Sequence, residues 1–131
     1  MSFIISKEKP LNIYLKDKNI SSVNIALSSF IRDLEALFTA PNLIDDINKS
    51  DIVLSISNLG HIEEYKIEIT DNSIFITGND DLGLIYGIYR FLEKELHVHP
   101  LYLMEGIELP KLNSVTLNNS ELTEIPDSMC I

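Results

Sequence analysis

Tryptophan, cysteine and basic residues are scarce in this sequence, and each scarcity excludes a class of site or partner. There is no Trp, and the single cysteine, Cys130, excludes an intrachain disulfide framework and a cysteine metal cluster. Only 10 Lys and Arg oppose 20 Asp and Glu, which leaves a net charge of −10. Because such a surface repels phosphate groups, nucleic acid and anionic membranes are excluded as partners.

Long apolar runs are also missing. Near the start, Phe3-Ile4-Ile5 is too short for the core of a signal peptide, and the charged residues follow it instead of preceding it. The most apolar stretch, residues 82–96, contains Arg90 and three other charged residues and is too short to span a bilayer. We expect a cytoplasmic protein from the chain as given, and a secreted one if a signal was trimmed from it.

The 131 residues, of which 45% are hydrophobic, suffice for one folded domain with a real core. Alternation of apolar and polar residues predicts strands at 11–15 and 64–69, and a returning strand at 73–77 follows the turn pair Asp71-Asn72. The β-branched run 51–56 is typical of a central strand that is buried on both faces. Residues 42–50 read as a polar connection between elements.

Two helices complete the pattern. The first begins with Ser21 or Ser22 as its N-cap and ends before Pro41, and its apolar positions are Val23, Leu27, Phe30, Ile31, Leu34, Leu37 and Phe38. The second spans about residues 81–96, with an apolar stripe at Ile85, Ile88, Tyr89, Leu92 and Leu96. Gly83 and Gly87 share one face of that helix, where glycine costs about 1 kcal/mol relative to alanine, so we expect close contact with a strand or helix there.

After Pro100 the chain contains only short extended pieces, 101–103 and 115–117. The resulting order is β-α-β-β-β-α followed by an extended tail. The predicted fold class is α/β (α+β, two-layer), with a mixed sheet of about four strands and both helices packed on it.

Acidic pairs at 45–46, 63–64 and 80–81 are the first candidates for catalysis. Glycoside hydrolysis needs two carboxylates about 5–10 Å apart across a cleft, whereas neighbours along a strand face opposite ways. Asp80 and Asp81 already have a structural role at a helix N-terminus, where negative charge is stabilised. We therefore favour solvated or capping carboxylates over catalytic ones.

Three histidines are the remaining candidates for a metal site or a small hydrolase: His61, His97 and His99. Zinc requires three or four ligands, and the spacing of these residues matches no metalloprotease motif. Cys130 has no basic neighbour that would lower its pKa. We expect no metal, cofactor or catalytic residue in this chain, and we expect Tyr86 and Tyr89 to pack in the core.

The segment Gly78-Asn79-Asp80-Asp81-Leu82-Gly83 lies between a predicted strand and a predicted helix, as a phosphate-binding loop would. It lacks the lysine of a P-loop and the third glycine of a dinucleotide-binding motif, and its aspartates would repel phosphate. Helix capping is the better interpretation of this segment.

The same segment continues through Leu84-Ile85-Tyr86-Gly87-Ile88-Tyr89-Arg90-Phe91-Leu92-Glu93. Together with the hairpin before it, it resembles the N-terminal, non-catalytic domain of α-glucuronidases and, more distantly, the domain that precedes the barrel in β-hexosaminidases. The motif residues that carry this resemblance are Gly78, Asn79, Asp80, Asp81, Gly83, Tyr86 and Gly87. The likeness covers residues 50–110 well and continues weakly to Pro126.

The resemblance implies a zincin-like two-layer domain without zinc, and catalytic carboxylates in a (β/α)₈ barrel that this chain does not contain. It implies an accessory domain at 1–110, an extended tail or linker toward that barrel at 111–131, and the barrel of the same protein as its partner. Gly78 would let the chain turn, while Gly83 and Gly87 would let the helix approach the sheet. A free-standing module that binds carbohydrate or protein is the alternative function.

Overall fold

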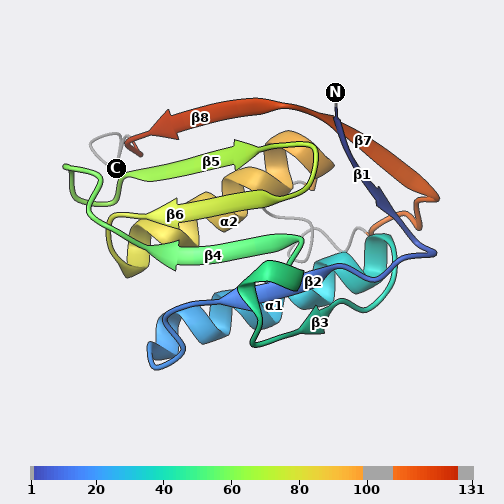
Figure 1. Cartoon of the computed structure of the whole chain (residues 1–131), viewed down its shortest axis with the longest axis horizontal. Helices are drawn as coiled ribbons and strands as arrows, with labels where there is room; N and C mark the ends of the chain where they lie inside the picture. Colours follow the sequence, from blue (N-terminus) through green and yellow to red (C-terminus); the bar gives the residue numbers. More distant parts are fainter. Residues whose placement is uncertain (1, 99–107, 127–131) are drawn as a thin grey trace.

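The computed structural model describes residues 2–98 and 108–126, and it places two helices against a mixed β-sheet (Figure 1). The six-stranded sheet has the order β3-β2-β4-β6-β5-β8. Its strands are β2 (Asn12–Leu15), β3 (Asn42–Leu43), β4 (Ile52–Ile56), β5 (Tyr65–Ile69), β6 (Ile74–Gly78) and β8 (Ser120–Glu124).

The three strands β2, β4 and β6 run parallel at the centre of the sheet, and β3 extends this parallel part at one edge. The hairpin of β5 and β6 and the pairing of β5 with β8 are antiparallel. A separate two-stranded ribbon pairs β1 (Ser2–Ser6) with β7 (Ser114–Asn118). The two strands of this ribbon therefore come from distant parts of the sequence, one near its start and one near its end.

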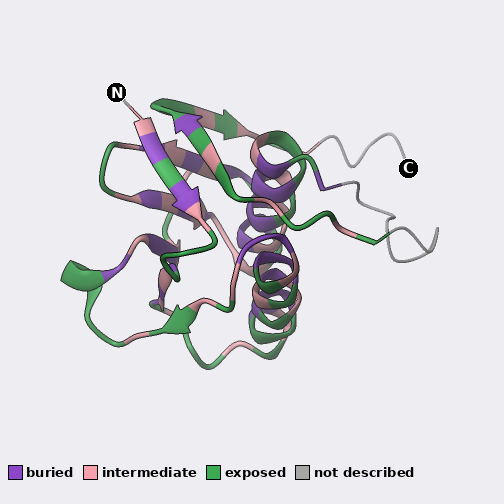
Figure 2. Cartoon of the chain, turned by 90° about the vertical axis from the view of Figure 1, so that its right-hand side faces the viewer, coloured by how far each residue is buried: buried purple, intermediate pink, exposed green. Residues whose placement is uncertain are grey.

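Helices α1 (Ser21–Leu37) and α2 (Asp81–Leu96) lie side by side on one face of the large sheet (Figure 2). The core fills the space between these layers, and Phe30 of α1 meets Phe91 of α2 edge to face, with ring centroids 6.1 Å apart. Strand residues alternate accordingly: in β5, Tyr65, Ile67 and Ile69 are buried and the residues between them are not. No helix in the described ranges has the length and apolar character to cross a membrane.

The predicted fold class is confirmed, although the sheet has six strands where about four were expected. The two additional strands lie at the sheet edges. β3 has only two residues, and β8 is polar with no buried residue, so neither carries the alternation that signals a strand. The sequence does not predict β1 either, because its apolar run of three residues is short and does not alternate with polar residues.

The tail expected at 111–131 is extended where the structure describes it, since its residues form β7 and β8. Leu117 of β7 is buried in the core. The extended piece expected at 101–103 lies outside the described residues. The connection expected at 42–50 contains β3 and the short 3₁₀ helix η1 (Ile47–Lys49) as well as turns.

The expected N-cap of α1 is wrong. The N-cap residue is Ile20, and no side chain caps this helix end; Ser21 and Ser22 already belong to the helix. The hydroxyl of Ser22 instead donates to Oδ2 of Asp81 at 3.2 Å, which links the first turns of the two helices. The apolar side chain of Ile20 packs against the core, so burial fixes this end of the helix instead.

The apolar stripe predicted for α2 is partly wrong as well. Ile85 is only partly buried and Tyr89 is 47% exposed, whereas Leu84, Ile88 and Phe91 are fully buried. The reason is that Gly83 and Gly87 lie on the buried side of α2. The buried apolar residues are therefore those that share this side with the glycines, and Ile85 and Tyr89 lie on the other side. Tyr86 is partly buried, and its packing against the core agrees with expectation.

Candidate functional site

The junction between β6 and α2 holds the motif residues that the sequence singled out. Gly78 ends β6, and a Cβ atom at this position would lie 2.0 Å from the backbone nitrogen of Leu84. Its φ angle is not positive, so a left-handed backbone is not the reason for a glycine at this position. Gly78 is required here because the backbone of α2 lies directly over the end of the strand.

Gly83 and Gly87 allow the same helix to contact β5 and the loop before it. A Cβ on Gly83 would lie 2.4 Å from the carbonyl oxygen of Glu64, and one on Gly87 would lie 2.9 Å from Cγ2 of Ile76. Real Cβ atoms do not approach neighbours this closely, so the sequence expectation of close contact agrees with the geometry.

Asp80 is the N-cap of α2. Its Oδ1 accepts a hydrogen bond from the backbone N–H of Gly83 at 2.8 Å, and its Oδ2 accepts one from the N–H of Glu63 at 2.9 Å. Burial acts to raise the pKa of Asp80, but the two backbone donors, together with the Asn79 amide, outweigh it and hold the pKa below its usual value. The carboxylate therefore remains charged and is committed to backbone donors.

Asn79 joins the same junction to the loop between β4 and β5. Its side-chain oxygen accepts hydrogen bonds from the backbone N–H groups of Leu59 and Gly60. The backbone N–H of Asn79 donates to the carbonyl oxygen of Glu64. With Asp80, it holds residues 59–64 across the end of the sheet. We call these residues the clasped loop.

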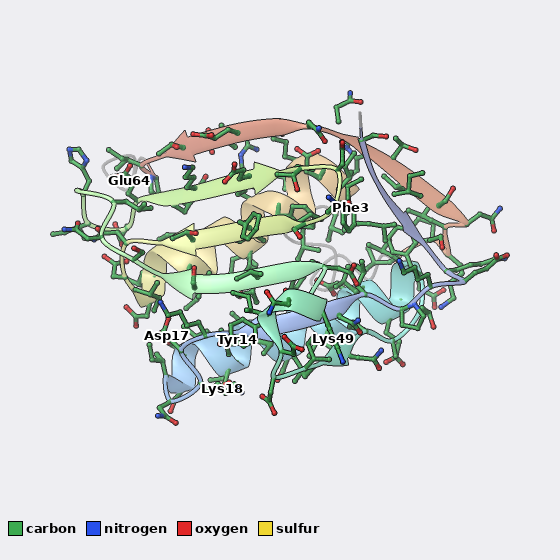
Figure 3. The ribbon with its side chains drawn as sticks, viewed as in Figure 1. Phe3, Tyr14, Asp17, Lys18, Lys49 and Glu64 are labelled. Atoms are coloured by element: carbon green, nitrogen blue, oxygen red, sulfur yellow. The ribbon has the colours of Figure 1, made fainter. Side chains whose placement is uncertain are left out.

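Two residues of the clasped loop have left-handed or glycine-favoured backbone angles, Gly60 with φ 113° and Glu63 with φ 64°. Within the loop, the buried carboxylate of Glu64 accepts from the backbone N–H of His61 at 3.1 Å and lies 3.0 Å from its ring Nδ1. His61 itself is mostly exposed, and Ile62 at the tip is 78% exposed. Figure 3 shows Glu64 at the end of the sheet where the clasped loop lies.

A second polar cluster joins the edge strand β8 to the body of the domain. The hydroxyl of Tyr65 donates to Oε1 of Glu124 at 2.5 Å, and Arg90 Nε donates to the same oxygen at 3.0 Å. The Tyr65 hydrogen bond is the main reason that the pKa of Glu124 is lowered, and burial is the main reason that the pKa of Tyr65 is raised. Sequence reasoning missed this cluster because its hydrogen-bonded pairs lie 34 and 59 residues apart in the chain.

The outer surface of the helices is apolar in places. Ile25 of α1 is 69% exposed, and Leu82 and Tyr89 of α2 are 43% and 47% exposed. Leu82, Ile85 and Tyr89 lie three and four positions apart and so share one side of α2. The helix is therefore apolar on its outer side as well as toward the sheet.

Most carboxylates of the three acidic pairs make structural contacts. Asp46 caps η1 through the backbone N–H of Asn48, and Asp45 pairs with Lys18. Glu64 and Asp80 bind backbone groups as described above. The arrangement therefore fixes loops and helix ends.

No group of three or more metal-ligating side chains occurs among residues 2–98 and 108–126. His97 is the C-cap of α2 in left-handed conformation, and its N–H donates to the carbonyl of Leu92. His99 and Cys130 lie outside the described residues, so the expectation that neither the histidines nor the cysteine forms a site stays a prediction.

Comparison with known proteins gives the fold a context. No protein-family model and no curated protein matches the sequence. The structure is similar to the GH115 4-O-methyl-α-glucuronidase BtGH115A, which has specificity for decorated arabinogalactans, with a TM-score of 0.78 and 18% identity. That likeness covers 93% of this chain and 18% of the enzyme.

GH20 enzymes have the same fold in part of their chains. The β-N-acetylhexosaminidase from Streptomyces coelicolor A3(2) matches with a TM-score of 0.61 and 14% identity, over 96% of this chain and 24% of the enzyme. The enzyme from Bacteroides fragilis NCTC 9343 matches with a TM-score of 0.54 and 20% identity, over 89% and 22%. This chain thus has a fold that recurs as a part of larger glycoside hydrolases, and it spans less than a quarter of their length.

Proposed function

We propose that this chain is a non-catalytic accessory domain of a carbohydrate-active enzyme of the α-glucuronidase-like kind, and that it supports a catalytic (β/α)₈ barrel elsewhere in the same protein. The observation that carries the proposal is the likeness to BtGH115A, which takes in nearly all of this chain and less than a fifth of that enzyme. A chain that matches only this share of the enzyme is of the size expected for one domain of a larger hydrolase.

The chemistry of the motif supports an accessory role. The side chains of Asn79 and Asp80 accept hydrogen bonds from backbone N–H groups, and the motif glycines make room for α2. The polar groups of this motif thus hold a loop and a helix end in place, which is a structural role.

The outer side of α2 supports the proposed partner. Leu82 and Tyr89 expose apolar surface that a covering domain would remove from water, at about 25 cal/mol per Å². We assign this side of α2 to contact with the barrel.

The reading frame downstream of Ile131 in the natural gene provides the test. We expect it to encode a barrel, and the full product to hydrolyse an α-glucuronide, whereas the isolated chain does not. A natural stop codon after Ile131, with no barrel encoded nearby, would count against the proposal, as would hydrolysis by the isolated chain.

Variants on the helix surface make the test specific. In the full product, Tyr89→Glu should lower the unfolding temperature of the barrel, whereas Glu68→Gln on the opposite face of the sheet should not. Equal effects of the two changes would contradict the assignment of this helix surface to the barrel.

A further inference from the structure

A small cavity lies where the β1–β7 ribbon meets the end of the large sheet that is opposite to the clasped loop. Its volume is about 160 Å³, and its walls come from β1, from the turn before β2, from the start of β4 and from the β5–β6 turn. Its apolar part comes from Ile4, which is 63% exposed, and from Leu11 and Phe3 (labelled in Figure 3), which are buried. None of the motif residues contributes to it.

The polar part of the cavity is built by three charged residues from three different segments: Lys9, Asp51 and Asp71. Asp51 Oδ2 accepts from the backbone N–H of Asn12 at 2.8 Å, and Asp71 Oδ1 accepts from the side chain of Asn119 at 2.8 Å. These bonds orient both carboxylates. Within the described residues, the second oxygen of each carboxylate accepts no hydrogen bond, and Lys9 has no ion-pair partner.

The charges restrict the class of ligand. An inorganic anion is disfavoured because two carboxylates line the cavity and the protein has a net charge of −10. A divalent cation is disfavoured because the Lys9 ammonium repels it and two carboxylates are too few ligands. A neutral molecule with several hydroxyl groups satisfies all the groups together. Its hydroxyls donate to Asp51 and Asp71 and accept from Lys9 and the Asn72 amide, while its C–H surface contacts Ile4.

The size of the cavity restricts the ligand further. It is smaller than the roughly 300–1,000 Å³ typical of pockets for drug-sized ligands. It has room for one sugar ring and none for an enclosed oligosaccharide. We propose that this cavity is a binding site for a single neutral saccharide unit, formed by Asp51, Asp71 and Lys9 beside the exposed side chain of Ile4. The site does not depend on the accessory role proposed above.

Titration of the ¹⁵N-labelled chain with methyl β-D-glucopyranoside, followed by amide NMR shifts, tests the proposal. We expect saturable shifts at residues 3–4, 9–11, 51 and 71–72, with a Kd of about 1 mM, as suits a ligand of this size. Absence of saturable shifts up to about 100 mM, roughly a hundred times that Kd, with this probe would overturn the proposal. Stronger shifts of the same amides with calcium, inorganic phosphate or glycine would also overturn it.

Variants that replace one charged side chain by a neutral one separate an effect on binding from an effect on folding. Asp71→Asn and Lys9→Met change exposed residues, and each should weaken binding about tenfold because a charge-assisted hydrogen bond is lost. Asp45→Asn makes the same charge change at a residue that pairs with Lys18, outside the cavity, and should leave the Kd unchanged. Equal affinity of Asp71→Asn and wild type, with the fold retained in the amide spectrum, would contradict the proposal.

Discussion

The two helices lie side by side on one sheet, yet they are held there in different ways. α2 begins at a carboxylate cap and passes over Gly78 with backbone against backbone. It places Gly83 against the loop before β5, and Gly87 against β5 and β6. α1 has no side-chain cap and begins at an apolar residue that packs on the core. Position is therefore set by steric fit and directed hydrogen bonds for α2, and by the area of apolar surface buried for α1.

The difference has a consequence for tolerance to mutation. Burial is non-directional and roughly proportional to area, so a helix held by it accepts small changes. Close backbone contact leaves no room for one additional methyl group. Substitutions should therefore be far more costly at the start of α2 than at the start of α1.

The largest effect is expected for Gly78→Ala. The new Cβ would lie 2.0 Å from the backbone nitrogen of Leu84, and backbone atoms cannot yield as a side chain can. We expect the free energy of unfolding to fall by about 3 kcal/mol or more in urea denaturation. Thr77→Ala on the same strand serves as the control and should lose no more than about 1 kcal/mol.

Gly87→Leu comes next. Here the Cβ would lie 2.9 Å from Ile76 Cγ2 and 3.2 Å from Tyr65 Cβ, which are side-chain atoms with some freedom, but the rest of the leucine has no space. We expect a loss of about 3 kcal/mol, measured by thermal melting. Ser28→Leu on the exposed side of α1 is the matched control. A melt of Gly87→Leu identical to wild type would show that α2 does not lie as close to the sheet as described.

Asp80→Asn should have an intermediate, pH-dependent effect. The new amide still accepts from Gly83, but its NH₂ group would face the N–H of Glu63, so we expect a loss of about 1–2 kcal/mol at neutral pH. Because the folded-state pKa of Asp80 is lowered, its stabilisation is present above the ordinary value of 3.8 and is lost as the pH falls through the folded-state pKa. Urea denaturation between neutral pH and about pH 3 should show the difference from wild type shrinking toward acid. A difference independent of pH would mean that the charge contributes nothing.

The smallest effect is expected at the start of α1, for Ile20→Asp. A carboxylate cap would contribute about 1 kcal/mol, and the loss of a partly buried apolar side chain would cost a similar amount. The net change should stay below about 1 kcal/mol in either direction. A loss above 2 kcal/mol would place this helix start in the same rigid class as that of α2 and remove the contrast between the helices.

The fold class could be predicted from the sequence because the signals for its helices and strands are periodic and local. The alternation at Tyr65–Ile69, the turn pair that follows and the glycine spacing in α2 all correspond to elements in the structure. The edge strands β3 and β8 were missed because an edge strand faces water and needs no apolar alternation. The start of α1 was misplaced because serine is a good cap only where its oxygen meets a free backbone N–H.

The polar sites depended on tertiary structure far more. A capping role for Asp80 was predictable from its place before a helix, but its second hydrogen bond, to Glu63, depends on how the clasped loop lies. Nothing local in Lys9, Asp51 or Asp71 predicts a shared cavity, since the three come together only through strand pairing and the position of the β1–β7 ribbon.

By itself, the sequence determined an α/β fold with an acidic composition, two helices, a central run of strands and a motif that contains three glycines. Only the tertiary structure decided why the glycines are needed, which side of α2 faces water, and which charged groups share a cavity. The physical reason is range: periodicity and capping act over a few residues, whereas close approach, burial and electrostatic neighbourhood depend on segments that lie far apart in the chain.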